Sequence, residues 1–585
     1  LNFTIENTSL DGFAFAITAH LNDNEYFNVL SDDIFIEELP AGGESPMISF
    51  DIKVNDEAPL GTFIMGMDIS ATVYQEGFGE FEYEDTVDYE FAISIDQKGF
   101  PYETLDQVFC SPSIFDLDQD GNNEIIFGDN SGMFYILNQE DMSTYNSYDT
   151  GDEIWGGVAI DDLDQDGDYE VVITSKNKFF YIFDHNGELV VAYDTEQYLT
   201  ANPAIGLSSE GNKVVYIPTY DNDGKVLMFE IDQNSLQMSE FYVGKKIKKS
   251  VAVHDINNDG ASDFVYGTDD DTLEIVIDGE VSVYQVDGKI QSAPVIIEFR
   301  NDEYLVIAGS KDDNLYAFNP LLGTAHFIYE TEGDVESPSI FEHSQYGTVI
   351  VFGSSDGYLY MIDTNGNDIP GWPKDLSGPI KGSPAISDIN GDGGVDVLIG
   401  QSEGKFYAFN ENGDILNNFP LVIEFPFTSS PTISDIDNDN DLDILVGGSS
   451  ALYAYDIKDL NGSNTDYWSM YRGNYQRTGY FESENYLDDQ LIVDEDIPLV
   501  FNINLVYPNP FNPVATINVD IPSDEQFNLS IFDIKGSLIQ EIYSGIKPAG
   551  NYIFNWDGSN YSSGMYLVKL SYNDSYKYHK IMLVK

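Results

Sequence analysis

One unit of sequence recurs along the middle of the chain, and this repeat constrains the fold more than any single residue does. Each unit begins with a short recurring segment, here called its opening. An apolar strand such as EIIFG follows, and after it a second strand rich in Tyr and Phe such as GYLYMID. Successive openings are 43 to 48 residues apart, the length of a four-stranded propeller blade. The spacing predicts a β-propeller over residues 98–480. The openings read SPSIFD (111–116), GVAIDD (157–162), NPAIGL (202–207), SVAVHD (250–255), APVIIE (293–298), SPSIFE (337–342), SPAISD (383–388) and SPTISD (430–435).

Eight openings predict eight blades. Seven blades is the alternative, if one degenerate unit near 293 or 337 is an insertion. The stretch GFPYETLDQVFCSPS before the first opening echoes GWPKDLSGPIKGSPA before the seventh. Residues near 99–105 are therefore expected to supply the outer strand of the last blade, which would close the ring and leave no exposed sheet edge.

The flanking segments also indicate β-structure, so the predicted fold class is all-β. Residues 1–97 contain short alternating strands between Gly, Pro, Asn and Asp clusters, the pattern of a sandwich. In pattern they resemble the immunoglobulin-like (Ig-like) spacer modules of bacterial surface proteins. The chain opens at Leu1 without Met, and we expect a truncated N-terminus that an enzymatic domain could precede. Residues 481–502 are expected to be an acidic linker, and residues 503–585 a β-sandwich.

The charge balance limits the partners of the chain. Against 102 Asp and Glu stand 25 Lys and Arg, giving a formal charge of −77. Such a field repels nucleic acids and anionic lipid, favours cations, and equally suits solubility in an extracellular medium. The single cysteine, Cys110, excludes an internal disulfide, and no apolar run reaches the length of a membrane span.

Five of the eight units contain a nine-residue loop of the form D-x-[DN]-x-D-[GN]-x-x-[DE] between two predicted strands. Ca²⁺ prefers six to eight oxygen ligands, and alternate residues of a tight loop can supply them. Side chains at positions 1, 3, 5 and 9 and the backbone carbonyl at position 7 are the expected donors, and Gly at position 6 permits the turn. About five Ca²⁺ sites are predicted. Their residues are Asp116, Asp118, Asp120, Asn122 and Glu124; Asp162, Asp164, Asp166, Asp168 and Glu170; Asp255, Asn257, Asp259, Ala261 and Asp263; Asp388, Asn390, Asp392, Gly394 and Asp396; and Asp435, Asp437, Asp439, Asp441 and Asp443.

These loops are distinct from EF-hand loops. An EF-hand needs an acidic residue at position 12 and flanking helices, whereas position 12 here is apolar in all five cases and lies within a predicted strand. A polar turn without metal is the simpler alternative, and five equivalent loops argue against it. The units that open at 202, 293 and 337 lack the loop and are expected to be metal-free.

With these loops in place, residues 98–480 resemble the FG-GAP (VCBS, integrin-α-like) repeat family. The resemblance implies blades that bind Ca²⁺ in such loops and a ring whose other loops take ligands. The chain differs from integrins in having five loops, so no integrin ligand carries over. The resemblance to the repeat family implies a binding or adhesion module, with a surface glycan or a protein as ligand.

No catalytic residues are predicted. Nearly every clustered carboxylate occupies a loop position or the linker, which leaves no glycosidase pair, and the histidines show no zinc spacing. The hairpins also resemble quinoprotein propellers, but the Trp-rich docking and cysteine pair of that family are missing. A calcium-dependent polysaccharide lyase remains the enzymatic alternative, although the sequence shows no obvious basic cluster to receive uronate carboxylates.

The last 80 or so residues resemble the type A C-terminal sorting domain of the bacterial type IX secretion system. The match includes Tyr507-Pro508-Asn509-Pro510-Phe511, Trp556-Asp557-Gly558, Ser563-Gly564-Met565-Tyr566 and the Lys-rich end. The resemblance implies the outer-membrane translocon as a partner and secretion to the outer surface of a Gram-negative bacterium of the Bacteroidetes type. Millimolar extracellular calcium would fill weak loops there.

Overall fold

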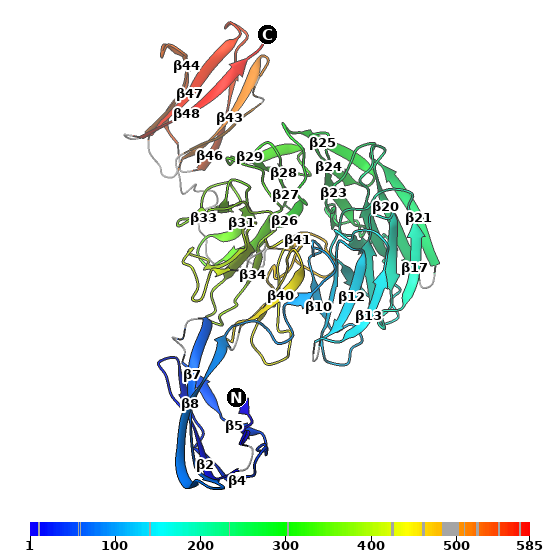
Figure 1. Ribbon diagram of the computed structural model, residues 1–585. Helices are drawn as coiled ribbons and strands as arrows, with labels where there is room; N and C mark the ends of the chain where they lie inside the picture. Colours follow the sequence, from blue (N-terminus) through cyan, green and yellow to red (C-terminus); the bar gives the residue numbers. More distant parts are fainter. Residues whose placement is uncertain are drawn as a thin grey trace, which may run out of the picture.

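The computed structural model describes residues 1–9, 12–55, 58, 60–139, 142–232, 235–300, 303–422, 426–458, 462–482, 502–507, 509, 511–521, 526–547, 550–572 and 575–585 (Figure 1). Every regular element in these residues is a β-strand, which confirms the predicted all-β class. The same residues contain no helix that could span a membrane. The predicted acidic linker, 481–502, lies outside the described residues except at its two ends.

The N-terminal module is built on one antiparallel sheet with strand order β4-β2-β7-β8. Two small sheets, β1-β5 and β3-β6, accompany it, and Phe27 and Phe50 pack with Leu21 and Met67 in the core. Its Ig-like character stays a prediction. The strands are β1 (Asn2–Phe3), β2 (Gly12–Leu21), β3 (Phe27–Val29), β4 (Ile34–Leu39), β5 (Ile48–Ser49), β6 (Ile52–Val54), β7 (Gly61–Gln75) and β8 (Gly79–Ile93).

Eight antiparallel sheets follow one another through the described part of the repeat region. Each begins with a short strand formed by one of the recurring openings. The first four sheets are β10 (Ser113–Phe115), β11 (Glu124–Gly128), β12 (Met133–Asn138) and β13 (Thr144–Asp149); β14 (Ala159–Asp161), β15 (Glu170–Thr174), β16 (Phe179–Phe183) and β17 (Leu189–Asp194); β18 (Ala204–Leu207), β19 (Lys213–Pro218), β20 (Lys225–Asp232) and β21 (Ser235–Tyr242); and β22 (Ala252–His254), β23 (Asp263–Gly267), β24 (Thr272–Ile277) and β25 (Glu280–Gln285).

The remaining sheets of this region repeat the pattern with two variations. The fifth sheet gains a parallel strand, β41, and the eighth takes its outer strand, β9, from before the first sheet. These sheets are β26 (Val295–Arg300), β27 (Glu303–Gly309), β28 (Asn314–Asn319), β29 (Thr324–Glu330) and β41 (Tyr480–Glu482); β30 (Ser339–His343), β31 (Gly347–Gly353), β32 (Tyr358–Asp363) and β33 (Lys374–Asp375); β34 (Ala385–Ser387), β35 (Asp396–Gly400), β36 (Lys405–Asn410) and β37 (Leu421–Val422); and β38 (Thr432–Ser434), β39 (Asp443–Gly447), β40 (Ala451–Asp456) and β9 (Tyr102–Glu103).

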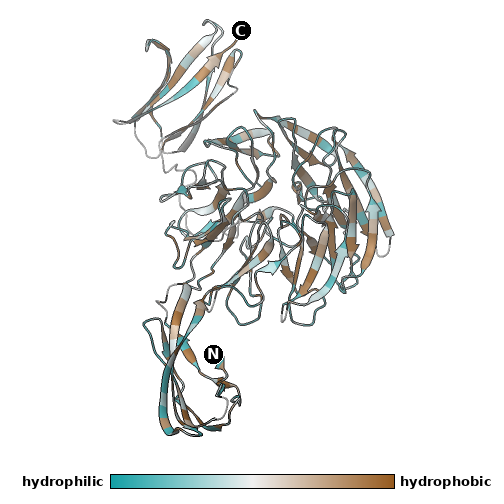
Figure 2. Cartoon of the chain, viewed as in Figure 1, coloured by the Kyte–Doolittle hydropathy of each residue, from teal (hydrophilic) through white to brown (hydrophobic). Residues whose placement is uncertain are grey.

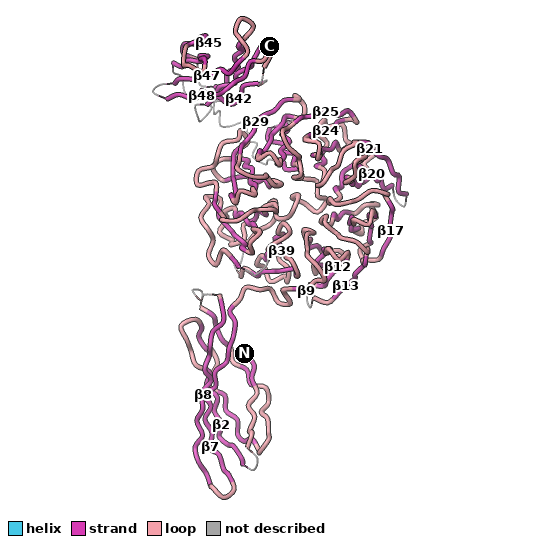
Figure 3. Tube along the Cα trace, turned by 45° about the horizontal axis from the view of Figure 1, so that its top comes forward, coloured by secondary structure: helices cyan, strands magenta, loops and turns pink. Residues whose placement is uncertain are grey.

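The sheets stand around a closed ring (Figure 3). First strands contact those of neighbouring sheets, and β10 contacts β38, so the first and last sheets are adjacent. Tyr102 and Glu103 of β9 pair with Leu452 and Ala451 of β40. The predicted closure by residues near 99–105 is thereby confirmed.

The second strand of each sheet is apolar because it is covered on both faces. All five residues of β11, β23, β35 and β39 are buried, and Figure 2 shows brown, hydrophobic strands within the ring. The tyrosines of the third strands pack inside as well; the rings of Tyr135 and Phe127 stack 4.9 Å apart. Neighbouring sheets therefore share apolar clusters between their faces.

A central segment, residues 468–479, occupies the middle of the ring, where loop trace crosses it in Figure 3. Its carbonyls accept hydrogen bonds from backbone N–H groups of the first strands of six sheets, over 2.8 to 3.0 Å. The donors are Ile386, Ile433, Ile160, Ile205, Val253 and Ile296. Its two arginines, Arg472 and Arg477, are almost completely buried.

Both arginines donate to groups of the surrounding sheets. Arg477 donates from Nε to the Val158 carbonyl at 2.7 Å and from Nη2 to Ser113 Oγ at 2.5 Å. Arg472 donates to the carbonyls of Val251, at 2.6 Å, and Pro294. The central segment thus connects sheets that lie far apart in sequence.

The C-terminal module has two facing sheets with strand orders β42-β43-β46 and β45-β44-β47-β48. Its core surrounds Trp556, whose ring lies 5.3 Å from that of Phe511 and 5.0 Å from that of Tyr566. Residues 503–585 hold seven Asp and Glu against six Lys, so the acidity of the chain belongs to its other parts. The strands are β42 (Asn502–Tyr507), β43 (Val514–Ile521), β44 (Gln526–Asp533), β45 (Leu538–Ile546), β46 (Gly550–Asp557), β47 (Gly564–Tyr572) and β48 (Ser575–Leu583).

Candidate calcium loops

All five acidic loops occupy the same place, the connection between the first and second strands of a sheet. The residue at position 1 directly follows the first strand, and the residue at position 9 begins the second. The loops join β10 to β11, β14 to β15, β22 to β23, β34 to β35, and β38 to β39. Every predicted ligand therefore lies at one end of the first strands, on one face of the ring.

The five loops share three backbone hydrogen bonds. The N–H of position 2 donates to the carboxylate of position 9 over 2.7 to 3.1 Å, as Leu117 does to Glu124. The N–H of position 6 donates to the carboxylate of position 1 over 2.7 to 3.1 Å. The N–H of position 7 donates to the carboxylate of position 5 over 2.7 to 3.2 Å. These bonds fold each loop around its own acidic side chains.

Two positions of each loop adopt positive φ. Position 6 has φ between 72° and 102°, and it is Gly in four loops and Asn440 in the fifth, the residue types that tolerate this conformation. Position 4 has φ between 58° and 67° in all five, which the sequence analysis did not anticipate. Three of the five position-4 residues are Asn or Gly, which tolerate positive φ, and this was the sequence signal for the conformation.

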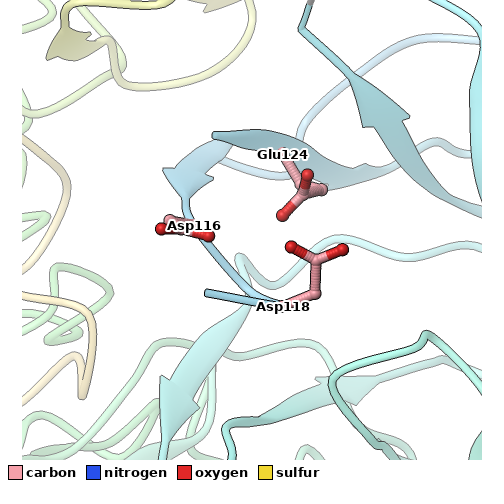
Figure 4. A group of neighbouring side chains, drawn as sticks. All are labelled: Asp116, Asp118 and Glu124. Carbon is pink, nitrogen blue, oxygen red and sulfur yellow. The ribbon is translucent and has the colours of Figure 1, made fainter. Parts of the chain in front are cut away.

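The side chains at positions 1, 3 and 9 converge in three loops. In the first loop Asp116, Asp118 and Glu124 each place a carboxylate oxygen within 4.8 Å of the others, and Figure 4 shows the three groups facing one another. The second and fifth loops make the same group with Asp162, Asp164 and Glu170, and with Asp435, Asp437 and Asp443. Such all-oxygen groups suit a hard divalent cation.

In the third and fourth loops position 3 is Asn, so fewer carboxylates meet. Asn257 and Asn390 use their side-chain oxygens to accept the N–H of position 5, at 3.2 and 3.0 Å. Asp278, from the turn after β24, accepts a hydrogen bond from Asn257 Nδ2 at 3.0 Å and adds a carboxylate to the third loop. Asp278 lies outside the nine-residue pattern, so the sequence alone does not indicate it.

Several buried carboxylate oxygens in these loops have no hydrogen-bond partner among the described residues. They include Oδ1 of Asp116, Asp164, Asp396 and Asp443. Burying an anionic oxygen without a partner is costly, and native proteins rarely leave such groups unpaired. A bound cation would supply the missing partner, so the donor set fits Ca²⁺ in both chemistry and geometry.

Burial and neighbouring negative charges raise the pKa of every position-9 carboxyl. The pKa of Glu124, Glu170 and Asp396 rises to about 7, that of Asp263 to about 6 and that of Asp443 to about 8. Burial is the largest cause in each case, with the other acids of the loop adding to it. Without a cation, these carboxyls hold protons that they would release on unfolding.

This proton binding predicts how pH affects the metal-free protein. The pKa values of the position-9 carboxyls are higher in the folded state than in the unfolded state. Proton binding therefore stabilises the metal-free folded protein at low pH, and this stabilisation is lost as pH rises through about 6 to 8. Protons and Ca²⁺ compete for the same oxygens, so we expect the gap in melting midpoint (Tm) between calcium-loaded and EDTA-treated protein to widen from about pH 5.5 to about pH 8. Thermal melts in both conditions measure it; a gap that is constant with pH would contradict the assignment.

The fifth loop differs from the others because a lysine forms ion pairs with its acidic side chains. Lys458 Nζ lies 2.8 Å from Asp439 and 3.8 Å from Asp441, and it also pairs with Asp456. Asp456 forms a second acidic group with Asp437 and Asp439. Lys458 thus partly neutralises position 5 of this loop, while Asp435, Asp437 and Asp443 stay grouped at the positions proposed to bind a cation.

Position-4 side chains connect one loop to the next around the ring. Gln119 of the first loop donates to the Gly167 carbonyl of the second at 2.7 Å, and Gln165 of the second donates to the Gly211 carbonyl of the third sheet at 3.1 Å. Asn438 of the fifth loop donates to the Gly121 carbonyl of the first at 3.4 Å. In these three loops the residue with positive φ at position 4 therefore has a side chain that joins adjacent sheets.

Two of the three sheets without acidic loops have described connections, and both are shorter than the acidic loops. Residues 208–212 join β18 to β19, and residues 344–346 join β30 to β31. In the first of these, Ser208 and Gly211 make an ordinary backbone turn, Gly211 N–H to the Ser208 carbonyl at 2.9 Å. That these units are metal-free stays a prediction.

The C-terminal module provides the clearest relation to a known family. Residues 505–585 match the profile of the family described as "Secretion system C-terminal sorting domain", which confirms the predicted type IX sorting domain. In the structure, Trp556 and Tyr566 of the recognised motifs are core residues, and the Gly558 N–H donates to the Pro513 carbonyl at 2.7 Å. Pro508 and Pro510 lie outside the described residues.

Comparison with solved structures finds distant similarity to several proteins. The computationally designed Ika8 protein is 16% identical, with a TM-score of 0.43 over 60% of this chain and 100% of that one. BamB from Moraxella catarrhalis is 15% identical, with a TM-score of 0.42 over 58% and 95%. Sqt1 from Saccharomyces cerevisiae is 11% identical, with a TM-score of 0.46 over 61% and 100%. A search of curated protein sequences finds no match.

Proposed function

We propose that this chain is a calcium-loaded, eight-bladed β-propeller that serves as a binding module on the outer surface of a Gram-negative bacterium. The sorting domain marks the chain as a secreted protein, and the ring has the architecture of a propeller. The repeat is proposed to belong to the FG-GAP type, with Ca²⁺ in five of its blades. The ring is proposed to be non-catalytic, and its ligand to be a surface glycan or a protein.

One observation supports the calcium assignment most strongly. Five loops from separate repeats make the same three backbone hydrogen bonds, and four of them leave a buried carboxylate oxygen without a partner among the described residues. A polar turn needs Asp and Asn at its corners, but it does not need buried anions that face one another. A bound cation accounts both for the burial of these carboxylates and for their facing one another.

Calcium counting tests the proposal directly. After EDTA treatment and dialysis into metal-free buffer, the full chain should take up about five Ca²⁺ in a calorimetric titration, with affinities of the extracellular class. Asp396→Asn removes one charge from the fourth loop and should lower the count by about one. Asp414→Asn, at an exposed position of the same sheet's hairpin, is the matched control and should leave the count unchanged. A count of zero in the unaltered chain would refute the proposal.

A further inference from the structure

An axial cavity of about 640 Å³ opens at the end of the ring that does not carry the acidic loops. Its lining comes mainly from the segments that lead into the first strands of all eight sheets, so it lies on the ring axis. The acidic loops follow the same first strands, and the two features therefore face opposite sides of the ring. A volume of this size is typical of small-ligand sites.

The lining of the axial cavity is basic, unlike the chain as a whole. It includes Lys248, Lys249, Lys311 and Lys381, whereas its only acids are Asp334 and Glu336 among the described residues. Both acids pair with Lys311, at 2.9 and 3.5 Å. The other three lysines have no ion pair within the described part of the chain, in a protein with about four acids for every base.

Leaving a half-buried lysine such as Lys248 unpaired is costly. Lys248 and Lys249 are adjacent and half-buried, and among the described residues the Lys248 ammonium has only the neutral Gln291 Oε1 as a hydrogen-bond acceptor, at 3.1 Å. Burial, and next to it the charges of Lys249 and Lys311, lowers the pKa of Lys248. Many lysines elsewhere in the ring have carboxylate partners, such as Lys213 with Asp161 at 2.6 Å. An anionic ligand would compensate the cluster.

Aromatic side chains stand beside the lysines. Phe109 and Trp155 both line the cavity and meet edge to face, with ring centroids 6.1 Å apart. Phe109 is exposed, and the Lys176 ammonium lies over the ring of Trp155, 4.3 Å from its centroid. Flat apolar rings next to lysine ammonium groups are suited to acidic sugars, which present both C–H faces and carboxylates.

We propose that the axial cavity binds an acidic carbohydrate, with uronate carboxylates held by Lys248, Lys249 and Lys381 and a sugar ring packed against Phe109 and Trp155. This inference rests on the proposed role of the ring as a binding module and names its ligand class. An acidic peptide would use the lysines but not the aromatic wall, which is why a carbohydrate is preferred. The central segment lies just beyond the cavity along the first strands, since it bonds to residues a few positions further on, such as Val253.

Calorimetry with trigalacturonate, a probe too short to form calcium gels, tests the inference on the calcium-loaded full chain. The double variant Lys249→Gln, Lys381→Gln should weaken binding about tenfold or more, because two charge-assisted contacts are lost. The double variant Lys98→Gln, Lys577→Gln makes the same change in net charge at exposed positions outside the cavity and should bind normally. Binding should also weaken with added salt.

Several results would overturn the inference. They are equal affinity for a neutral trisaccharide, equal affinity for a hexaglutamate peptide, no binding of trigalacturonate, or full binding by the cavity variant. The calcium count and Tm of the same samples separate these results from a failure of the calcium-loaded fold. Conversion of the probe to an unsaturated product, followed by ultraviolet absorbance, would support the ligand class and identify the ring as a lyase.

Discussion

Removing calcium is expected to lower the Tm of the ring by roughly 10 °C or more, and adding calcium back should restore it. A site of the extracellular class at ten to a hundred times its Kd contributes about 1.5 to 2.7 kcal/mol, and five sites act on one ring. Each loop joins the first and second strands of its sheet, so a bound ion stabilises the innermost part of the fold. Even if the five sites stabilise the ring only partly together, their combined contribution to its free energy of unfolding is large.

Intrinsic tryptophan fluorescence during heating is a suitable measurement, because three of the four tryptophans, Trp155, Trp372 and Trp468, lie in the ring. The N-terminal module contains no tryptophan, so its unfolding is silent, whereas Trp556 reports on the C-terminal module. Magnesium at the same concentration is the control and should restore much less, since Mg²⁺ loses its hydration water reluctantly and demands octahedral geometry. An identical midpoint in EDTA and in calcium would refute a structural role for the loops.

Proposed calcium binding has a physical reason in the composition of this chain. A lone, buried cysteine cannot cross-link a secreted protein, and burial raises the pKa of the Cys110 thiol to about 11, which keeps it unreactive. The carboxylates that face one another across each loop repel when no cation is present. A bound divalent ion would turn that repulsion into a cross-link that depends on the extracellular medium.

The repeat region was the part most predictable from sequence. Its openings became the first strands, and the echo around residues 99–105 correctly indicated the strand that pairs with β40. The loops were predictable for a related reason: alternating acids and a Gly or Asn at position 6 determine the turn and bring together the side chains proposed to bind Ca²⁺. A local pattern that occurs five or eight times at equivalent places is a more reliable basis for prediction than a pattern that occurs once.

Features made by single, distant contacts were not predictable. The central segment, with the sequence WSMYRGNYQRTG, has no periodicity, and nothing local indicates that its carbonyls accept backbone hydrogen bonds from six sheets. The axial cavity was missed for the same reason. Its lysines come from segments up to about 130 residues apart, so the sequence shows isolated bases where the folded ring has a basic cluster.

Replacing Arg477 with Met should destabilise the ring by about 2 to 4 kcal/mol. The substitution removes the donors to Val158, Tyr471 and Ser113, and leaves those buried acceptors unpaired. One effect opposes this loss: burial lowers the pKa of Arg477 to about 10, so Met would relieve the cost of keeping a buried charge. Three orphaned acceptors at about 1 to 3 kcal/mol each outweigh that relief.

Denaturant unfolding in calcium buffer, followed by ring fluorescence, measures the effect. Lys98→Met makes a similar chemical change at an exposed position and should alter the free energy of unfolding by less than about 0.5 kcal/mol. Arg477→Lys keeps the charge but has one nitrogen in place of the guanidinium fork, so it should recover only part of the loss. If Arg477→Met is too unstable to purify, Arg477→Lys still gives a measurable value. A stability equal to that of the unaltered chain in Arg477→Lys would mean that the central segment is held by its backbone contacts alone.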